Sequence, residues 1–482
     1  MKPSKRSRKR YDSAAVGADS SKTLSVGRSS DLERLPLDLA FVILRLLPIR
    51  DALSLCATCK PLYAISHYRS FWVYANLDAD AMGRRPGPLD YSKLSLSALK
   101  NRIAKSHRIF RLWRSEYVNP QRTRVLPVNA KILRVVAIPW TTLLVTAEAT
   151  SVVLHNWATK LTRVVPVVWN DSMRIFDIRI FWIQSIRRNV LVVGLSNRYH
   201  DPPHRTELQL FVVDVDEPSA VYLTTAKFPY WISTFVLAEA RLAVVGHTHT
   251  WTYFIHAMDV CYIPIGPPVT IAIASLGRHW PVPASSFTIM DDSHYLFAGP
   301  HGVAVYKLSQ TNFKANESIP IHVRPCWQHE YSEYEVVYRP ILGHVFFDPV
   351  KRHRTVSLCS GAYLRRVIMM PNDEFRLTES VLVEGIPLNW GGLAAGLHVG
   401  VYHRPLGSPA FRTFRMTDNA VDVHPFTSTL SVNRSDGGSV SHRIKGVPVP
   451  GTLLMDEGEG RIMFMLRISS RRASIVVLEF VL

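Results

Sequence analysis

The first segment with a regular apolar pattern runs from Asp31 to Trp72. It is rich in leucine, and its apolar residues recur at helical spacing. Apolar residues recur there at i, i+4 and i+7, as Leu39, Ile43 and Leu46. This period is typical of an amphipathic helix. Pro36 suits the first turn of that helix, and Pro48 marks its end.

Two further short helices follow in the same segment. Asp51 can cap the second helix or lie in its first turn, and its apolar positions are Leu53, Leu55 and Cys56. Pro61 opens the third helix, whose apolar positions are Leu62, Ile65 and Tyr68. We therefore expect three compact helices, followed by the aromatic residues Phe71 and Trp72 at the end of the segment.

A Gly/Pro-rich joint from Gly83 to Pro88 leads into one more helical pattern. Its apolar positions fall near one face: Leu96, Leu99, Ile103, Phe110 and Trp113. Its basic positions lie largely away from that face: Lys100, Arg102, Lys105, Arg108, Arg111 and Arg114. The pattern predicts a basic amphipathic helix whose aromatic face packs on the β domain while its charges stay in water.

Beyond about Val125 the pattern changes to short Val, Ile, Leu and aromatic runs separated by turn residues, which predicts strands. Five runs share a layout of two apolar stretches around a turn: Leu143–Trp157, Val190–Val215, Leu242–Val260, Tyr295–Leu308 and Val345–Leu358. Their starts are separated by 47, 52, 53 and 50 residues, which suits propeller blades of roughly 40 to 50 residues.

A fainter candidate near Leu397 and a clear one at Arg461 bring the expected number of blades to six or seven. The last strand, within residues 468–482, could pair with the first blade and close the ring. A β-sandwich or two stacked β domains is the alternative. The expected fold class is α+β, with a disordered basic tail (1–30), a helical domain (31–78), a linker with the basic helix (79–124) and a propeller-like all-β domain (125–482).

Composition indicates the class of protein and its cellular compartment. With 47% hydrophobic and 20% charged residues, the bulk of the chain is typical of a globular protein. Five scattered cysteines favour a reducing compartment. The basic start leads into a Ser-rich stretch, and no apolar run is long enough to span a bilayer. We expect a cytoplasmic or nuclear protein without a membrane segment.

The net charge of +19 is concentrated in two clusters, six Lys and Arg within residues 1–10 and eleven, against three acids, within residues 80–124. Such clusters attract anionic partners. The run Lys5 to Arg10 is either a nuclear-import signal or a solvated basic tail.

The segment from Leu32 to about Leu77 resembles the F-box family, the docking module of SCF-type cullin-RING ubiquitin ligases. The positions that carry the resemblance are the opening Leu35-Pro36, then Leu39, Ile43, Leu46, Leu47, Asp51, Leu53, Leu55, Cys59-Lys60, Leu62 and Trp72. Trp113 is similar to a residue of the helix that follows the F-box in many fungal members. The resemblance implies that the module binds a Skp-type adaptor, and through it a cullin, while the remaining chain recruits a protein substrate.

The resemblance also implies which residues would line the adaptor interface: Leu35, Pro36, Leu39, Ile43, Leu46, Leu47, Leu53, Leu55, Leu62 and Trp72. The physical pattern points the same way, because three short helices cannot hide so many leucines in so small an interior. Apolar surface left over on such a segment marks a partner-binding face. The alternative is that these leucines pack on the β domain.

Patterns that carry chemistry are weak. Cys56 and Cys59 form a CxxC pair without a second pair nearby, and His247 and His249 share a strand face without a third ligand. Ser97 and Lys100 lack the accompanying motifs of acyl-transfer enzymes, and the glycines of residues 391–396 lack the context of a phosphate-binding loop. We expect neither a cofactor nor a metal.

The sequence therefore predicts a non-catalytic substrate receptor of a ubiquitin ligase. A nuclear nucleic-acid-binding protein that uses the basic clusters is the alternative from another class, and binding of nucleic acid is the less favoured interpretation. A propeller hydrolase with a helical cap would need convergent carboxylates or histidines in its central channel. The identity of the substrate cannot be read from the sequence.

Overall fold

The computed structural model describes residues 35–480, apart from several gaps. The longer gaps are 82–90, 113–119, 198–204, 248–252, 261–268, 278–285, 309–320, 332–340, 403–409, 425–446 and 449–453. The basic tail and the joint at residues 83–88 lie outside the described residues. The chain divides into two compact units, the first ending at Phe71 and the second beginning at Trp72.

The first unit contains the three helices that the sequence predicts: α1 (Leu37–Leu46), α2 (Ile49–Cys56) and α3 (Lys60–Ile65). Pro36 stands at the N-cap of α1, where its carbonyl accepts a hydrogen bond from the Ala40 N–H at 2.9 Å. Pro61 lies in the first turn of α3. Their buried apolar residues are Ala40, Leu44, Ala52, Cys56, Leu62 and Ile65.

A fourth helix, α4 (Arg69–Ala81), contains Phe71 and Trp72, which we expected to end the segment without a further helix. Phe71 and Trp72 lie in its first turn, and Ala75 and Asn76 are buried one turn later. This spacing of four is helical. The polar Asn76 concealed it in the sequence, because a buried polar residue does not extend an apolar pattern. The prediction of only three helices was therefore wrong.

The predicted basic helix is α5 (Leu96–Leu112), preceded by a short 3-10 helix, η2 (Tyr91–Lys93). Ser95 caps it, because its Oγ accepts a hydrogen bond from the Ala98 N–H at 3.2 Å. Its buried apolar residues are Leu99, Ile103 and Ile109. The Asn76 side-chain amide donates to the Trp72 carbonyl at 2.8 Å and to the Leu99 carbonyl at 3.2 Å, which joins α4 to α5. Trp113 lies outside the described residues.

Seven sheets, blades 1 to 7, make up the described β region. Blade 1 contains β2 (Arg134–Ala137), β3 (Leu143–Ala147), β4 (Val152–Asn156) and β5 (Thr162–Val164). Blade 2 contains β6 (Met173–Ile183), β7 (Arg188–Asn197), β8 (Thr206–Asp214) and β9 (Ser219–Phe228). Blade 3 contains β10 (Trp231–Ala238), β11 (Arg241–His247), β12 (Tyr253–Asp259), β13 (Val269–Gly277) and β17 (Ile321–His322). Blade 4 contains β14 (Ser286–Ile289), β15 (His294–Gly299), β16 (Gly302–Lys307) and β18 (Trp327–Glu330).

The remaining blades are less regular. Blade 5 contains β19 (Ile341–Asp348), β20 (His353–Ser360), β21 (Tyr363–Met369), β22 (Phe375–Leu377) and β23 (Val381–Leu382). Blade 6 contains β24 (Pro387–Ala394), β25 (Leu397–Tyr402), β26 (Ala410–Met416) and β27 (Val421–His424). Blade 7 contains β28 (Val447–Pro448), β29 (Leu454–Asp456), β30 (Arg461–Arg467), β31 (Arg472–Glu479) and the first strand of the β region, β1 (Arg122–Asn129).

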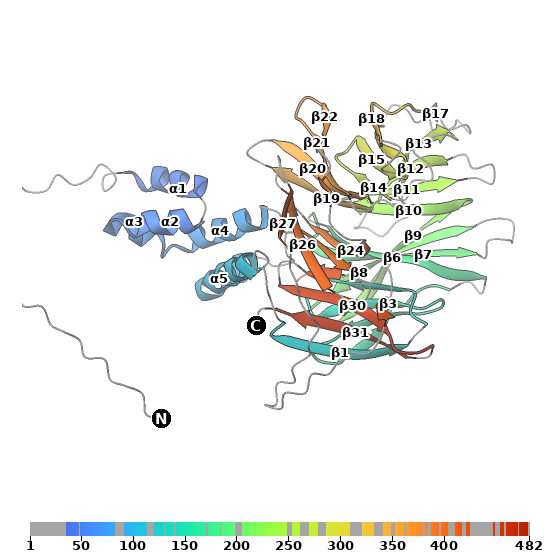
Figure 1. Cartoon of the computed structure of the whole chain (residues 1–482), viewed down its shortest axis with the longest axis horizontal. Coiled ribbons are helices and arrows are strands. Elements are labelled where there is room, and N and C mark those ends of the chain that lie inside the picture. Colours follow the sequence, from blue (N-terminus) through green and yellow to red (C-terminus); the bar gives the residue numbers. More distant parts are fainter. Residues whose placement is uncertain are drawn as a thin grey trace, which may run out of the picture. The chain divides into compact units, whose positions relative to one another are not determined.

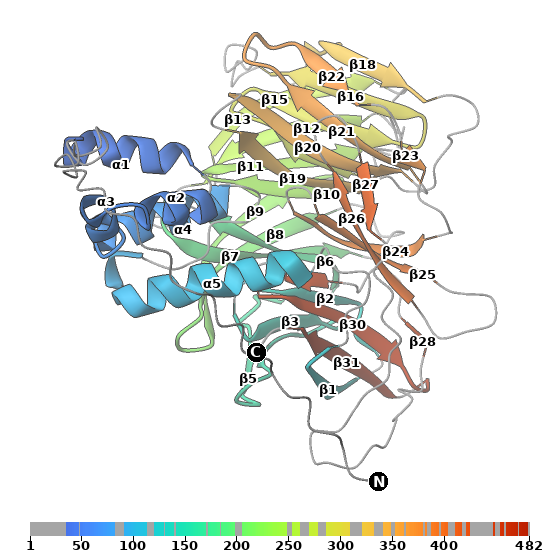
Figure 2. The same cartoon turned by 60° about the vertical axis from the view of Figure 1, so that its left-hand side comes forward.

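The blades form a closed ring (Figures 1 and 2). One strand of each blade contacts one strand of the next, in the order β2, β6, β10, β14, β19, β24 and β29, and β29 contacts β2 again. The described β region is therefore a seven-bladed propeller, where the apolar runs predict six or seven blades. The ring closes where β1 pairs with β31 in antiparallel register from Arg122↔Glu479 to Asn129↔Arg472.

The closure differs from the expected arrangement in one respect. The first strand joins the last blade, whereas we expected the last strand to join the first blade. The apolar runs of blades 1 to 4 are their second and third strands, while the run Val345–Leu358 falls on the first and second strands of blade 5. The candidates at Leu397 and Arg461 coincide with the starts of β25 in blade 6 and β30 in blade 7.

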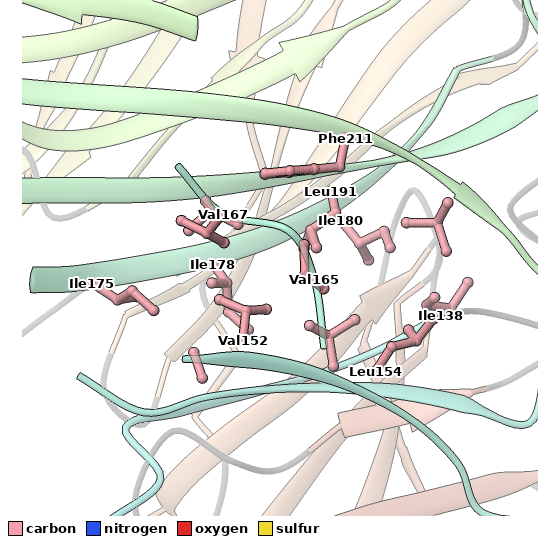
Figure 3. Close-up of a cluster of buried hydrophobic side chains, with 14 of the residues drawn as sticks. Ile138, Val152, Leu154, Val165, Val167, Ile175, Ile178, Ile180, Leu191 and Phe211 are labelled. Atoms are coloured by element: carbon pink, nitrogen blue, oxygen red, sulfur yellow. The ribbon is translucent and has the colours of Figure 1, made fainter. Parts of the chain in front are cut away.

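The apolar core lies between neighbouring blades. Figure 3 shows side chains of blade 1 facing those of blade 2, among them Val152 and Leu154 from one blade and Ile178, Leu191 and Phe211 from the other. The connecting segment that follows β5 adds Val165 and Val167 to this cluster. Strands buried on both faces read as continuous apolar runs, which explains why the second and third strands gave the clearest pattern.

Candidate functional site

An exposed apolar stripe on α1 is the clearest surface feature of the first unit. Leu39, Val42, Ile43 and Leu46 are 50%, 53%, 38% and 80% exposed, respectively. Their spacing of three and four residues places them along one side of the helix. We call these four residues the α1 stripe. Ala40 and Leu44, which are 2% exposed, form the opposite, buried side.

The α1 stripe owes its exposure to the composition of the helix. Only Asp38 and Arg45 are polar among the ten residues of α1, so the helix is apolar on more sides than its own unit can cover. Asp38 lies in the first turn and Arg45 in the last, where each charge is favourable to the helix dipole. Neither residue interrupts the stripe. The helix therefore buries one side in its own unit and leaves the other side exposed.

The ten residues predicted for the adaptor interface occupy different environments. Pro36, Leu39, Ile43 and Leu46 are exposed, and Leu35, Leu47, Leu53 and Leu55 are half-buried. Leu62 and Trp72 are buried, at 2% and 7% exposure. These two side chains offer little surface, so their place in the structure is that of core residues. The role of all ten in adaptor binding stays a prediction.

Sequence reasoning missed two exposed members of the same helix, Leu37 and Val42, which are 51% and 53% exposed. The signal for Val42 was present, because it lies three residues after Leu39 and four before Leu46. Two exposed aromatic residues, Tyr63 and Tyr68, belong to the same unit. The Tyr68 ring centroid lies 6.1 Å from that of Phe41 in α1.

The basic residues of α5 are partly engaged within the second unit. The Lys100 ammonium lies 5.3 Å from the centroid of the Trp72 ring, and the Arg102 guanidinium lies 5.5 Å from that of Tyr91. Lys105 forms an ion pair with Glu459. Arg108 is exposed, and Arg114 lies outside the described residues. Lys100, Arg102 and Lys105 make these contacts while their side chains remain partly exposed to water.

Glu459 belongs to a larger ionic cluster around Arg461, at the start of β30 in blade 7. The Arg461 guanidinium lies 3.3 Å from Glu459, 3.6 Å from Asp456 and 3.6 Å from Glu479. Glu479 also accepts a hydrogen bond from Arg124 at 3.1 Å. This cluster joins β30, β31 and β1 at the closure of the ring, and Lys105 joins α5 to it.

Residues considered for chemistry are dispersed. Burial and the neighbouring Cys59 raise the pKa of the Cys56 thiol, which makes it a poor nucleophile or metal ligand. The His247 ring packs 5.3 Å from that of Trp231, and His249 lies outside the described residues. Within the described part of the chain, no three His, Cys, Asp or Glu residues are grouped to hold a metal ion.

The SxxK motif and the glycine-rich run also lie within ordinary secondary structure. Ser97 Oγ shares a hydrogen bond of 2.9 Å with Ser95 Oγ at the start of α5, and the residues that begin the run 391–396 lie in β24. No helix in the described ranges is both long and apolar enough to cross a bilayer.

The family model for the F-box domain matches residues 32–74. No curated protein matches the chain. Similar solved structures include a chain of the mitotic checkpoint complex, with 10% identity over 74% of this chain and 91% of that chain and a TM-score of 0.42. The β-propeller domain of Myceliophteria thermophila Cps50 (Swd1) has 8% identity over 74% of this chain and 99% of that domain, and its TM-score is 0.42. The WD40 domain of fission yeast SCAP has 9% identity over 74% of this chain and 98% of that domain, with the same TM-score of 0.42.

The match over residues 32–74 covers α1, α2 and α3 and the first turn of α4. It includes the whole α1 stripe. The predicted resemblance is confirmed: residues 32–74 are an F-box domain, and a large β-rich propeller region follows it in the same chain.

Proposed function

We propose that this chain is the substrate-receptor subunit of an SCF-type cullin-RING ubiquitin ligase. An F-box domain implies this role in general, and F-box domains generally bind Skp-type adaptors. The observation that carries the proposal is the α1 stripe, four exposed apolar side chains inside the matched domain. The adaptor would cover the stripe and, through its own contacts, bring the chain to a cullin.

Helix docking suits the spacing of the stripe. Anchors at i, i+3, i+4 and i+7 are the pattern with which an amphipathic helix enters an apolar groove. Around them, Leu35, Pro36, Leu47, Leu53 and Leu55 are exposed or half-buried and would extend the contact. Leu62 and Trp72 would support the interface from the core and would not contact the adaptor.

The propeller would serve as the substrate-binding part. A closed ring leaves no long unpaired sheet edge at its junction, so the turns at the two ends of the blades are the surfaces with which it can select a protein. The mechanism is proximity, because holding substrate and ubiquitin-charged enzyme in one assembly raises their effective concentration. Catalysis would reside on other subunits, in the cytoplasm or the nucleus.

Co-elution of the full chain with a purified Skp-type adaptor tests the proposal. We expect the wild-type chain to form the complex, and a chain with Leu39→Asp and Leu46→Asp to lose it, because both carboxylates would be buried without partners. A matched control carries Leu161→Asp and Val164→Asp, which replace exposed apolar residues of blade 1. Equal co-elution of the α1 variant and the wild type would refute the proposal, as would equal loss in the control.

A further inference from the structure

The two ends of blade 7 differ in their surroundings. At the end we call near, the turn between β29 and β30 carries Glu459, which is paired with Lys105 of α5. At the far end, β30 finishes at Arg467 and a turn leads into β31 at Arg472. Seven residues of β30 separate the two ends by about 20 Å. The α5 helix therefore engages one end of the blade and leaves the turn at the far end apart from this contact.

Backbone hydrogen bonds and strand pairing connect the far ends of blades 7, 1 and 2 into one continuous surface. Arg472 pairs with Asn129, two residues before Lys131. Next along the chain, the Leu133 N–H donates a hydrogen bond of 2.8 Å to the carbonyl of Ala147, which is the last residue of β3 in blade 1. The turn that follows β3 continues the path, because the Ala149 carbonyl accepts a hydrogen bond from the Ile175 N–H of blade 2 at 3.1 Å.

Exposed cations and aliphatic side chains share this surface. We define the basic strip as Arg467, Ile468, Arg472, Lys131, Leu133 and Arg174. The four cations are exposed, and Ile468 and Leu133 are 51% and 47% exposed. Within the described ranges none of the four cations forms an ion pair, whereas the neighbouring Arg134 is paired with Asp177 at 3.2 Å. Glu148, in the turn of blade 1, is half-buried.

We propose that the basic strip binds an acidic peptide segment of the substrate through its aspartate and glutamate side chains, with aliphatic residues of the segment on Ile468 and Leu133. This inference rests on the proposed function and specifies the chemistry of the substrate. Charge complementarity supports it: unpaired cations of one sign attract and orient an anionic segment. The two exposed aliphatic residues give the segment apolar contacts, which distinguishes a peptide from a simple polyanion.

Binding of fluorescein-labelled peptides to the full chain, followed by fluorescence anisotropy, tests the inference. The probe is a twelve-residue peptide of alternating Asp and Leu. One reference peptide has Lys in place of Asp, and a second has phosphoserine in place of Asp. We expect the Asp peptide to bind, the Lys peptide not to bind, and binding to weaken as salt rises because the contacts are exposed.

The decisive variant combines Arg467→Glu and Arg472→Glu, both at exposed positions of one turn. We expect it to bind the Asp peptide at least about tenfold more weakly, because two attractions become repulsions. The matched control combines Arg163→Glu and Arg376→Glu, two exposed arginines on the edge strands β5 and β22. It should bind the Asp peptide as the wild type does. Thermal unfolding of each variant shows that the propeller is folded.

Three outcomes would overturn the inference: equal affinity of the Arg467/Arg472 variant and the wild type, equal weakening in the control, or binding of the phosphoserine peptide without binding of the Asp peptide. The last outcome would assign the strip to phosphorylated segments. Adaptor binding, measured on the same variants, should be unchanged. Failure of the adaptor complex alone would refute the proposed function while the peptide result stands.

Discussion

Truncation of Leu46 gives the most direct quantitative test of the α1 stripe. Leu46→Ala removes three side-chain carbons from a residue that is 80% exposed. Burial of each carbon group contributes about 0.8 kcal/mol, so covering this exposed side chain in a complex would contribute about 2 kcal/mol beyond alanine. This free energy corresponds to a Kd for the Skp-type adaptor about thirtyfold higher in the variant. Stability should change by no more than about 0.5 kcal/mol, because the side chain makes few contacts in its own fold.

Isothermal titration of the adaptor into the full chain measures the Kd, and thermal unfolding monitors the fold. Leu161→Ala is the control for a truncated leucine at a half-exposed site of blade 1, and it should leave the Kd unchanged. Leu44→Ala, on the buried side of α1, should instead lower the free energy of unfolding by about 2 to 5 kcal/mol. An adaptor Kd that is the same for Leu46→Ala and the wild type would show that the stripe is not the adaptor surface.

Three further predictions concern the second unit. A Cβ at Gly194 would lie 2.6 Å from the Phe176 ring, so Gly194→Ala should lower the free energy of unfolding by about 1 to 3 kcal/mol; Phe176→Leu in the same chain should recover part of this loss in urea unfolding. Burial lowers the pKa of His256 to about 4. Because the unfolded side chain titrates near 6.5, the stabilisation should be complete above that pH and decline as the pH falls toward 4, and the urea midpoint of His256→Gln should change less over this range. Asn76→Ala removes two side-chain hydrogen bonds to carbonyls of α4 and α5 and should cost about 1 to 3 kcal/mol, seen as a lower midpoint.

The helical part was predictable where its signals are local. The period of the leucines and the positions of Pro36 and Pro61 placed three helices, because helices form between residues close in sequence. The fourth helix was missed because its buried Asn76 is satisfied by α5, which the local pattern cannot show. The same limit applies to the adaptor residues. An apolar period shows that Leu46 and Leu62 lie on apolar faces, but not which face the chain itself covers.

The propeller was predictable from its repeat and not from its pairing. Four of the apolar runs are hairpins of second and third strands, whose two strands are neighbours in sequence. The placement of β1 in the last blade depends on residues far apart, and Arg124 and Glu479 are separated by 355 positions. The basic strip has the same origin, because Asn129, two residues before Lys131, pairs with Arg472 only when the ring has closed. No local pattern could reveal it.

The pairing of β1 with β31 also has a consequence for folding during translation, because the two strands are synthesised far apart in time. At a synthesis rate of roughly 5 to 20 residues per second, the ribosome needs roughly 20 to 70 s to travel the 355 positions from one partner to the other. Throughout that interval β31 is incomplete, so β1 has no strand to pair with in its own blade. Chaperone binding and premature association with other chains would therefore compete for this one strand until translation has passed Glu479.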